Sequence, residues 1–224
     1  MSETKTDPQP MCLPGLHEAV AQKIARRISP DSPLLDIAAG SGAFTRRLLD
    51  MGMSVIANDA DGSRWGIPEI DLMNVDLNTD FAEEFAGAGV EAIAAIEVIE
   101  HLDNPRDFLR QCRQLLPDGG FMFVTTPNVT SAASRAMFLR SGRTVFFSEG
   151  GPCAGEHITF LPWWLLADHA RAAGWEVIET EFAGQYTNLG FKVRLSRFLA
   201  AMLGRYDRPG EKKFGCTVMT LRKS

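Results

Sequence analysis

The sequence predicts an α/β fold with an open, mostly parallel sheet and helices on both of its faces. Three observations indicate this class. Residues 34–37 form a short apolar run that leads through a glycine-containing turn into a helical pattern. Segments of strand and helix character then alternate along most of the chain. Residues 92–96 are almost entirely apolar, as expected of a strand that is buried on both faces.

The elements around the glycine turn follow from local patterns. Residues 1–13 are polar or contain proline, and we expect them to be disordered. Residues 16–28 have apolar side chains at helical spacing. After the strand and the turn, residues 44–51 form the next predicted helix, and residues 54–59 form the second strand. Glycine and proline interrupt residues 61–68, where at most one helical turn fits.

The middle of the chain continues the alternation. We expect a third strand at residues 70–75, a short helix at 81–85 and the fourth strand at 92–96. Asn104 and Pro105 suit the start of a helix that runs to about Leu116. Residues 121–125 form the fifth strand.

The alternation lapses over residues 129–160. We interpret this segment, called the cap below, as an insertion over the active site that is partly helical near residues 132–139. The cap arginines, Arg135, Arg140 and Arg143, either meet an anionic group of the substrate or form a solvated face. The remaining expected elements are a helix at 162–173, a strand at 175–182, an amphipathic helix at 191–203 and a last strand at 214–221.

Composition limits the function classes. The 224 residues are 45% hydrophobic, which suits one domain over residues 1–224. The net charge of −5 argues against a nucleic-acid surface. The four cysteines are scattered, so we expect reduced thiols in a cytoplasmic protein. Residues 1–10 lack the pattern of a signal peptide, and no apolar run has the length of a membrane span.

The glycine turn has the spacing Asp36-x-Ala38-x-Gly40-x-Gly42. A dinucleotide fingerprint needs a third glycine at position 45, where Thr45 stands. The pattern resembles motif I of class I S-adenosylmethionine (SAM) methyltransferases, with Ala38 in place of the first glycine. The order of elements over residues 34–221 extends this resemblance. It implies a three-layer, Rossmann-like sheet whose last strand is antiparallel.

The same resemblance implies where SAM binds. Asp59 ends the second strand, where a carboxylate accepts hydrogen bonds from both ribose hydroxyls. Family members place an acidic residue near the adenine amino group, at the position of Asp76-Leu77. Glu97 either contacts the methionine part of SAM or ligates a metal. The predicted cofactor-binding residues are Asp36, Ala38, Gly40, Gly42, Asp59, Asp76, Leu77 and Glu97.

Glu97, Glu100 and His101 can share one face of a helical turn. Such a group either ligates a divalent cation or provides a base and its orienting partner. Together with Glu156-His157 and the residues 126–128, it resembles the ubiquinone-type polyprenyl O-methyltransferases and the small-RNA 3′-terminal 2′-O-methyltransferases. That resemblance implies a metal bound by Glu97, Glu100, His101 and His157.

The catalytic residues predicted from this group are Glu100, His101 and His157. Without a metal, His101 acts as the base and His157 orients the acceptor; a purely structural role is the remaining alternative. Both chemistries favour an oxygen acceptor, because a hydroxyl needs help to lose its proton.

We therefore expect a SAM-dependent O-methyltransferase that acts on the hydroxyl or carboxylate of a small molecule. The alternatives are an RNA 2′-O-methyltransferase, against which the acidic composition counts, and a SAM-binding protein without activity. The helix at 191–203 leaves three interpretations open: packing on the sheet, a homodimer contact or contact with a membrane surface.

Overall fold

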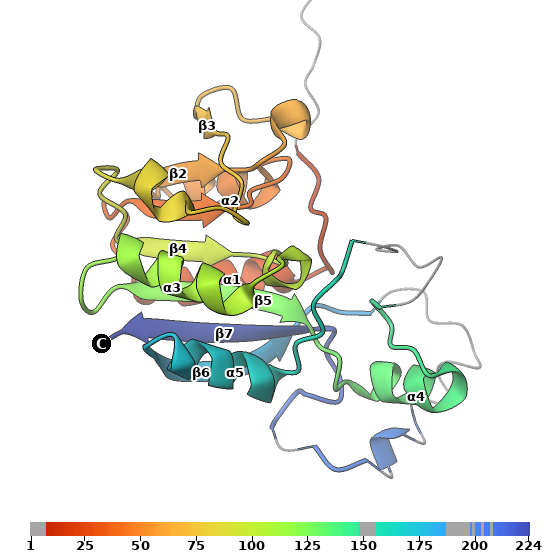
Figure 1. Ribbon diagram of the computed structural model, residues 1–224. Coiled ribbons are helices and arrows are strands. Elements are labelled where there is room, and N and C mark those ends of the chain that lie inside the picture. Colours follow the sequence, from red (N-terminus) through yellow and green to blue (C-terminus); the bar gives the residue numbers. More distant parts are fainter. Residues whose placement is uncertain (1–7, 148–155, 187–197, 199, 203, 207) are drawn as a thin grey trace, which may run out of the picture.

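The computed structural model describes residues 8–147, 156–186, 198, 200–202, 204–206 and 208–224 (Figure 1). Seven strands of the described chain form one sheet with the order β3-β2-β1-β4-β5-β7-β6. The first five are parallel, and β7 is antiparallel to both β5 and β6, as the sequence predicts. The strands are β1 (Leu34–Ile37), β2 (Val55–Asn58), β3 (Leu72–Met73), β4 (Ala92–Ala95), β5 (Phe121–Pro127), β6 (Trp175–Ala183) and β7 (Cys216–Lys223).

Helices cover both faces of this sheet and make the predicted three layers (Figure 1). Apolar side chains of α1 (Leu16–Ala25) and α2 (Ala43–Asp50) share one buried cluster with residues of β1, β4 and β5. On the opposite face, α3 (Pro105–Leu115), α5 (Trp163–Ala172) and the short 3-10 helix η2 (Phe81–Phe85) pack against alternate residues of the same strands. This alternation is the pattern of strands buried on both faces.

Local interactions explain several boundaries. Asn104 Oδ1 accepts the backbone N–H of Asp107 at 3.2 Å and so caps α3, as predicted. Residues 81–85 were expected to form a helix, and they form η2, which buries Phe81 and Phe85. Gln111 of α3 holds η2 in place, because it accepts the N–H of Ala82 and donates to the carbonyl of Thr79. Two further 3-10 turns are η1 (Gly62–Arg64) and η3 (Ile99–His101).

The part of the N-terminal segment that the structure describes contradicts the expectation of disorder. Leu13 fills the space beside Gly184 and Gly215, where added Cβ atoms would lie 2.9 and 2.1 Å from its side chain. Ser41 donates to the carbonyl of Gln9, and Arg64 contacts the sulfur of Met11. Residues 8–13 therefore lie against the protein through contacts that their own composition does not indicate.

The cap contains the predicted helix, observed as α4 (Ala132–Ser141). It lies beyond the carboxyl end of β5 rather than over the sheet (Figure 1). Arg135 of α4 bonds to Glu211 and to the carbonyl of Thr130, so it holds this part of the fold together. Residues 148–155 of the cap lie outside the described chain.

The predicted helix at 191–203 also falls largely outside the described residues. Of its apolar stripe, Phe198 and Met202 are described, and both are exposed. Ala200 packs against Ala132 and Ala136 of α4. Packing of this segment on the sheet is therefore wrong for the residues described, because its buried side chain faces α4.

Asn128 ties the end of β5 to the turn before β7. Its side-chain amide donates to the carbonyls of Glu211 and Phe214, and its oxygen accepts from Thr130. Replacement Asn128→Ala leaves these buried groups unpaired, so we expect the free energy of unfolding to fall by about 2–4 kcal/mol. Chemical denaturation measures the change.

The matched control is Asn74→Ala, because Asn74 is exposed and its side chain donates one hydrogen bond, to the carbonyl of Asp59. This variant should stay within about 1 kcal/mol of the parent protein. Equal losses in the two variants would contradict a special role for the buried amide.

Candidate active site

A cavity of ≈ 670 Å³ opens at the carboxyl ends of β1, β2 and β4. This volume is typical of small-molecule sites, which occupy about 300–1,000 Å³. Its walls come from the turn after β1 and from the segments after β2 and β4. The N-terminal segment, α1 and the cap residues on either side of 148–155 complete them. The residues that the argument uses are Cys12, His17, Asp36, Ala38, Gly40, Asp59, Arg64, Glu97, His101, Phe146 and His157.

The turn after β1 brings its backbone to the edge of the cavity. Ala38 has φ of 60° and Gly40 has φ of 59°, so both adopt the left-handed conformation. A Cβ atom at Gly40 would meet nothing within 4 Å, which leaves open space over its backbone. Ala38 holds a conformation that glycine suits better, in agreement with the glycine that motif I has there.

Gly42 has a different role from the one predicted. It does not line the cavity, and it precedes α2 with φ of 87°. A Cβ atom here would lie 2.5 Å from the Ile67 side chain and 3.0 Å from Trp65. The missing side chain therefore makes room for residues 65–67 rather than for the cofactor.

Asp59 is placed as a ribose-binding residue needs to be. Its Oδ2 accepts the N–H of Gly40 at 2.7 Å, and its Oδ1 accepts the N–H of Asp61 at 2.9 Å. Each carboxylate oxygen has a second lone pair that can accept a hydroxyl. Asp59 lines the cavity, so the two ribose hydroxyls of SAM fit this position.

Asp76 and Leu77 do not line the cavity. Asp76 is exposed and accepts the N–H of Asn78 at 2.9 Å. The Leu77 side chain is buried in the core, which leaves its backbone for any contact with adenine. The structure does not bring these two residues to the site, and their adenine contact stays a prediction.

Asp36 is buried at the end of β1, with 1% of its surface exposed. Its Oδ2 accepts the Thr45 hydroxyl at 2.6 Å, a contact that the sequence pattern did not reveal. Burial raises the pKa of Asp36 to about 7. Thr45, which stands where a dinucleotide fingerprint would have its third glycine, thus links β1 to α2 through this hydrogen bond.

Glu97 lines the cavity from the end of β4, with φ of 51°. Its carboxylate accepts the Thr125 hydroxyl at 2.9 Å and the Cys216 thiol at 3.3 Å. Burial raises the pKa of this carboxyl to about 7. Glu97 is thus bonded to β5 and β7, two partners that sequence reasoning missed.

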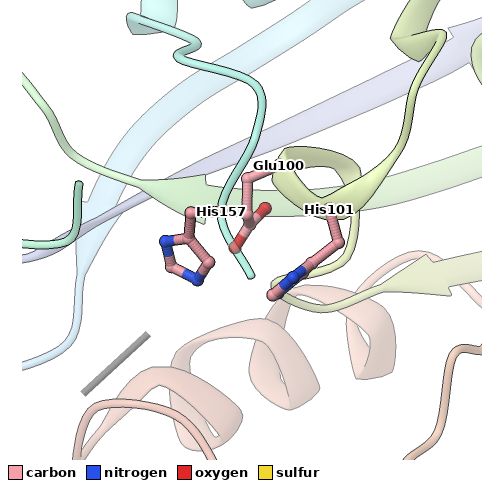
Figure 2. A group of neighbouring side chains, drawn as sticks. All are labelled: Glu100, His101 and His157. Atoms are coloured by element: carbon pink, nitrogen blue, oxygen red, sulfur yellow. The ribbon is translucent and has the colours of Figure 1, made fainter. Parts of the chain in front are cut away.

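The structure brings Glu100, His101 and His157 together (Figure 2). Glu100 and His101 belong to η3, and the Glu100 carbonyl accepts the N–H groups of Ile158 and Thr159 at 3.0 and 2.9 Å. These two bonds bring residue 157 beside η3. The imidazole rings lie 4.7 Å apart between centroids, and the Glu100 carboxylate lies between them in Figure 2.

Glu100 is buried, whereas His101 and His157 are partly exposed. No hydrogen bond of normal geometry reaches either carboxylate oxygen of Glu100, although the Thr126 side chain lies close to it. Burial together with Glu97 raises the pKa of Glu100 well above the ordinary value. Burial and the neighbouring His101 lower the pKa of His157 to about 4. His101 Nδ1 donates to the carbonyl of Glu156 at 2.9 Å, which leaves Nε2 as an acceptor.

Glu100, His101 and His157 can therefore hold a divalent cation. One ligand atom from each lies within 4.8 Å of the others. One carboxylate and two imidazoles suit Fe²⁺, Mn²⁺ or Zn²⁺, and leave positions open for substrate oxygens. Among the described residues, Glu97 is not a member of this group, and its carboxylate is bonded to Thr125 and Cys216. Its role as a fourth ligand stays a prediction.

Aromatic rings extend the site away from SAM. Phe146 lies in a stacked orientation against Tyr186, with ring centroids 6.1 Å apart and planes 16° apart. Phe147 contacts His157 and Phe160, each with centroids 5.3 Å apart. No local sequence pattern indicates that Tyr186 would meet Phe146 of the cap.

The buried Asp36 makes stability depend on pH. Its pKa of about 7 in the folded state exceeds the ordinary 3.8, so between these values the folded protein holds a proton that the unfolded chain has lost. Stability therefore falls as pH rises from about 4 to about 7. In ligand-free protein, we expect Asp36→Asn to remove this fall and to gain stability over the parent across that range.

At 1.36 kcal/mol per pKa unit, about 4 kcal/mol is the upper limit of this gain. Chemical denaturation at several pH values measures it, and the histidine contributions cancel in the difference between the two proteins. Parallel pH profiles would show that Asp36 is already ionised in the folded state.

None of the helices in the described part of the chain has the length and apolarity that a bilayer crossing requires.

Solved structures share the fold. A SAM-dependent methyltransferase from Archaeoglobus fulgidus superposes with a TM-score of 0.64 at 16% identity, over 92% of this chain and 94% of that one. The [4+2]-cyclase SpnF superposes with a TM-score of 0.56 at 17% identity, over 92% and 81%. Their low identities show the fold alone.

Sequence comparison gives the family. Residues 14–194 match the model of a methyltransferase domain. The ubiquinone biosynthesis O-methyltransferase of Sinorhizobium fredii is 32% identical over 143 residues, which are 58% of this chain and 57% of that protein. The corresponding protein of Caulobacter vibrioides is 34% identical over 107 residues, 45% and 42% of the two chains. The matches span about half the length of these curated relatives. The chain belongs to the methyltransferase-domain family and is a SAM-dependent methyltransferase.

Proposed function

We propose that this protein transfers the methyl group of SAM to a hydroxyl oxygen of an aromatic small molecule, at a divalent cation held by Glu100, His101 and His157. The observation that carries the proposal is the convergence of one buried carboxylate and two imidazoles, whose ligand atoms lie within 4.8 Å of one another, with no hydrogen bond of normal geometry to either Glu100 oxygen. A buried carboxylate without partners is costly, and a cation bound there offsets that cost. The O-methyltransferase relatives support oxygen as the acceptor atom.

The reaction itself needs positioning and removal of one proton. A lone pair of the acceptor oxygen attacks the methyl carbon, the carbon–sulfur bond breaks, and its electron pair stays on sulfur to give S-adenosylhomocysteine. A bound divalent cation lowers the pKa of the acceptor hydroxyl. His157, with its pKa of about 4, is neutral at pH 7, so its lone pair is available to the cation, and the proton that the acceptor hydroxyl loses leaves to solvent.

The walls favour a neutral aromatic acceptor over a carboxylate. Phe146 lines the cavity, lies near His157 and is stacked on Tyr186, while Phe147 packs against His157 from outside the lining; such aromatic surfaces bind planar rings well. Among the described residues that line the cavity, Arg64 is the only lysine or arginine, and it belongs to η1 after β2. Arg135, one of the cap arginines, is bonded to Glu211.

The test is a methyl-transfer assay that measures S-adenosylhomocysteine release from SAM with catechol, phenol or benzoate as acceptor. We expect turnover of catechol, whose adjacent oxygens can both reach a cation, and none of benzoate. A chelator should abolish it, and Mn²⁺ or Zn²⁺ should restore it. Glu100→Gln and His157→Ala should each lower kcat by about 100-fold or more.

His169→Ala is the matched control, because His169 lies on α5 and does not line the cavity. Turnover that survives chelation would exclude the cation and favour His101 or His157 acting alone as the base. Turnover of benzoate but not of either phenol would contradict the acceptor class.

SAM binding has its own prediction. Asp59→Ala removes both ribose contacts, and hydrogen bonds to a charged group are worth about 1.5–3 kcal/mol. Calorimetry should therefore show affinity for S-adenosylhomocysteine falling by about tenfold or more. Asp76→Ala is the comparison variant: a matching loss would support the predicted adenine contact, whereas unchanged affinity of Asp59→Ala would contradict the ribose site.

A further inference from the structure

SAM carries an amino-acid end with one ammonium and one carboxylate, and the cavity must pair both. Asp59 accounts for the ribose, and the methyl group must reach Glu100, His101 and His157. The amino-acid end therefore needs a third part of the wall, which nothing described so far assigns.

The sheet order indicates which part of the cavity wall remains for the amino-acid end of SAM. Asp59 follows β2, on one side of β1, whereas Glu97 follows β4, on the other side. Helix α1 packs on the β4 side, because its Lys23 forms salt bridges with Glu179 and Glu181 of β6, the edge strand of that side. Cys12 and His17 line the cavity from this side, and the charge of Glu97 acts on Cys12.

None of the described residues that line the cavity on this side is a lysine or arginine, although the charge of Arg47, which does not line it, acts on His17. The acidic member of this wall, Glu97, suits the ammonium group, since Thr125 and Cys216 hold its carboxylate in place. Arg64 lies at η1, after Asp59, and no other described residue of the cavity is a lysine or arginine. The carboxylate of SAM consequently needs a neutral donor on the α1 side.

His17 has the properties of such a donor. It is 7% exposed, lines the cavity and packs against Phe44 with ring centroids 4.9 Å apart. Its Nδ1 is buried and has no hydrogen-bond partner. Burial lowers its pKa to about 4, so the ring is neutral at pH 7 and one of its nitrogens carries a hydrogen to donate.

We infer that His17 of α1 is a cofactor-binding residue that donates a hydrogen bond to the carboxylate of SAM, while Glu97 accepts from its ammonium. A purely structural role for His17, as a packing residue against Phe44, is the alternative. The two roles differ in what they recognise. A carboxylate donor acts only on ligands that contain the amino-acid end, whereas a packing residue affects every ligand of the cavity.

The experiment compares two ligands by calorimetry: S-adenosylhomocysteine, which has the amino-acid end, and 5′-methylthioadenosine, which lacks it. His17→Phe keeps the ring and removes the donor. We expect affinity for S-adenosylhomocysteine to fall by about 10-fold and affinity for methylthioadenosine to change by less than about twofold. His17→Gln, which keeps an amide donor, should recover part of the loss.

Thermal melting of each ligand-free variant checks that the fold is intact, and His17→Leu, which also lacks a donor, replaces His17→Phe if the phenylalanine variant does not fold. Equal weakening of both ligands would overturn the proposal, because it is the result of a packing role. Unchanged affinity for S-adenosylhomocysteine would overturn it as well. The test uses no acceptor, so its failure is distinguishable from failure of the proposed methyl transfer.

Discussion

The candidate site depends on one backbone acceptor, the carbonyl oxygen of Glu100. It accepts the N–H groups of Ile158 and Thr159, and the Thr159 hydroxyl adds a bond to the carbonyl of Leu102. These contacts fasten a segment that is more than fifty residues away in sequence onto η3. His157 reaches His101 because of them, and the aromatic rings of the cap surround the same point. Without this attachment, η3 carries a glutamate and a histidine but no third ligand.

A second constraint is the gathering of acidic groups at the carboxyl edge of the sheet. Asp36 and Glu100 are buried there and Glu97 is partly buried, and desolvation raises the pKa of each. Hydroxyl and thiol donors from Thr45, Thr125 and Cys216 satisfy Asp36 and Glu97. No hydrogen bond of normal geometry reaches Glu100, which distinguishes it as the group that a ligand would complete. The fold thus fixes two carboxylates through hydroxyl and thiol donors and leaves the third beside two imidazoles.

Backbone strain is concentrated at the same edge. Ala38 and Glu97 are the two described non-glycine residues with positive φ, and they end β1 and β4, the neighbouring central strands. Each turns its chain sharply where the cavity begins. A conformation that costs about 1–2 kcal/mol is retained where it positions functional groups. At these two residues, the strain brings the glycine turn and the Glu97 carboxylate to opposite walls of one cavity.

Much of the fold followed from the sequence alone. The periodicities of residues 16–28 and 105–116, the apolar run at 92–96 and the glycine turn are local signals, and local signals are sufficient for element type and order. The spacing of Glu100 and His101 likewise placed both on one turn. The candidate metal group was predictable only in part, because the role of Glu97 as a fourth ligand, which the resemblance names, stays a prediction.

Tertiary structure decided what depends on partners distant in sequence. Thr125 and Cys216 come from β5 and β7, and only the sheet order brings them to Glu97. Leu13 is ordered by two glycines near β6 and β7, and Gly42 serves Ile67 rather than the cofactor. His17 gives the same periodic signal whether it faces a core or a cavity. The sequence by itself determined the fold class, the cofactor turn and the Glu100-His101 pair; the side chains that complete the site were decided by packing, because contacts across strands leave no local pattern.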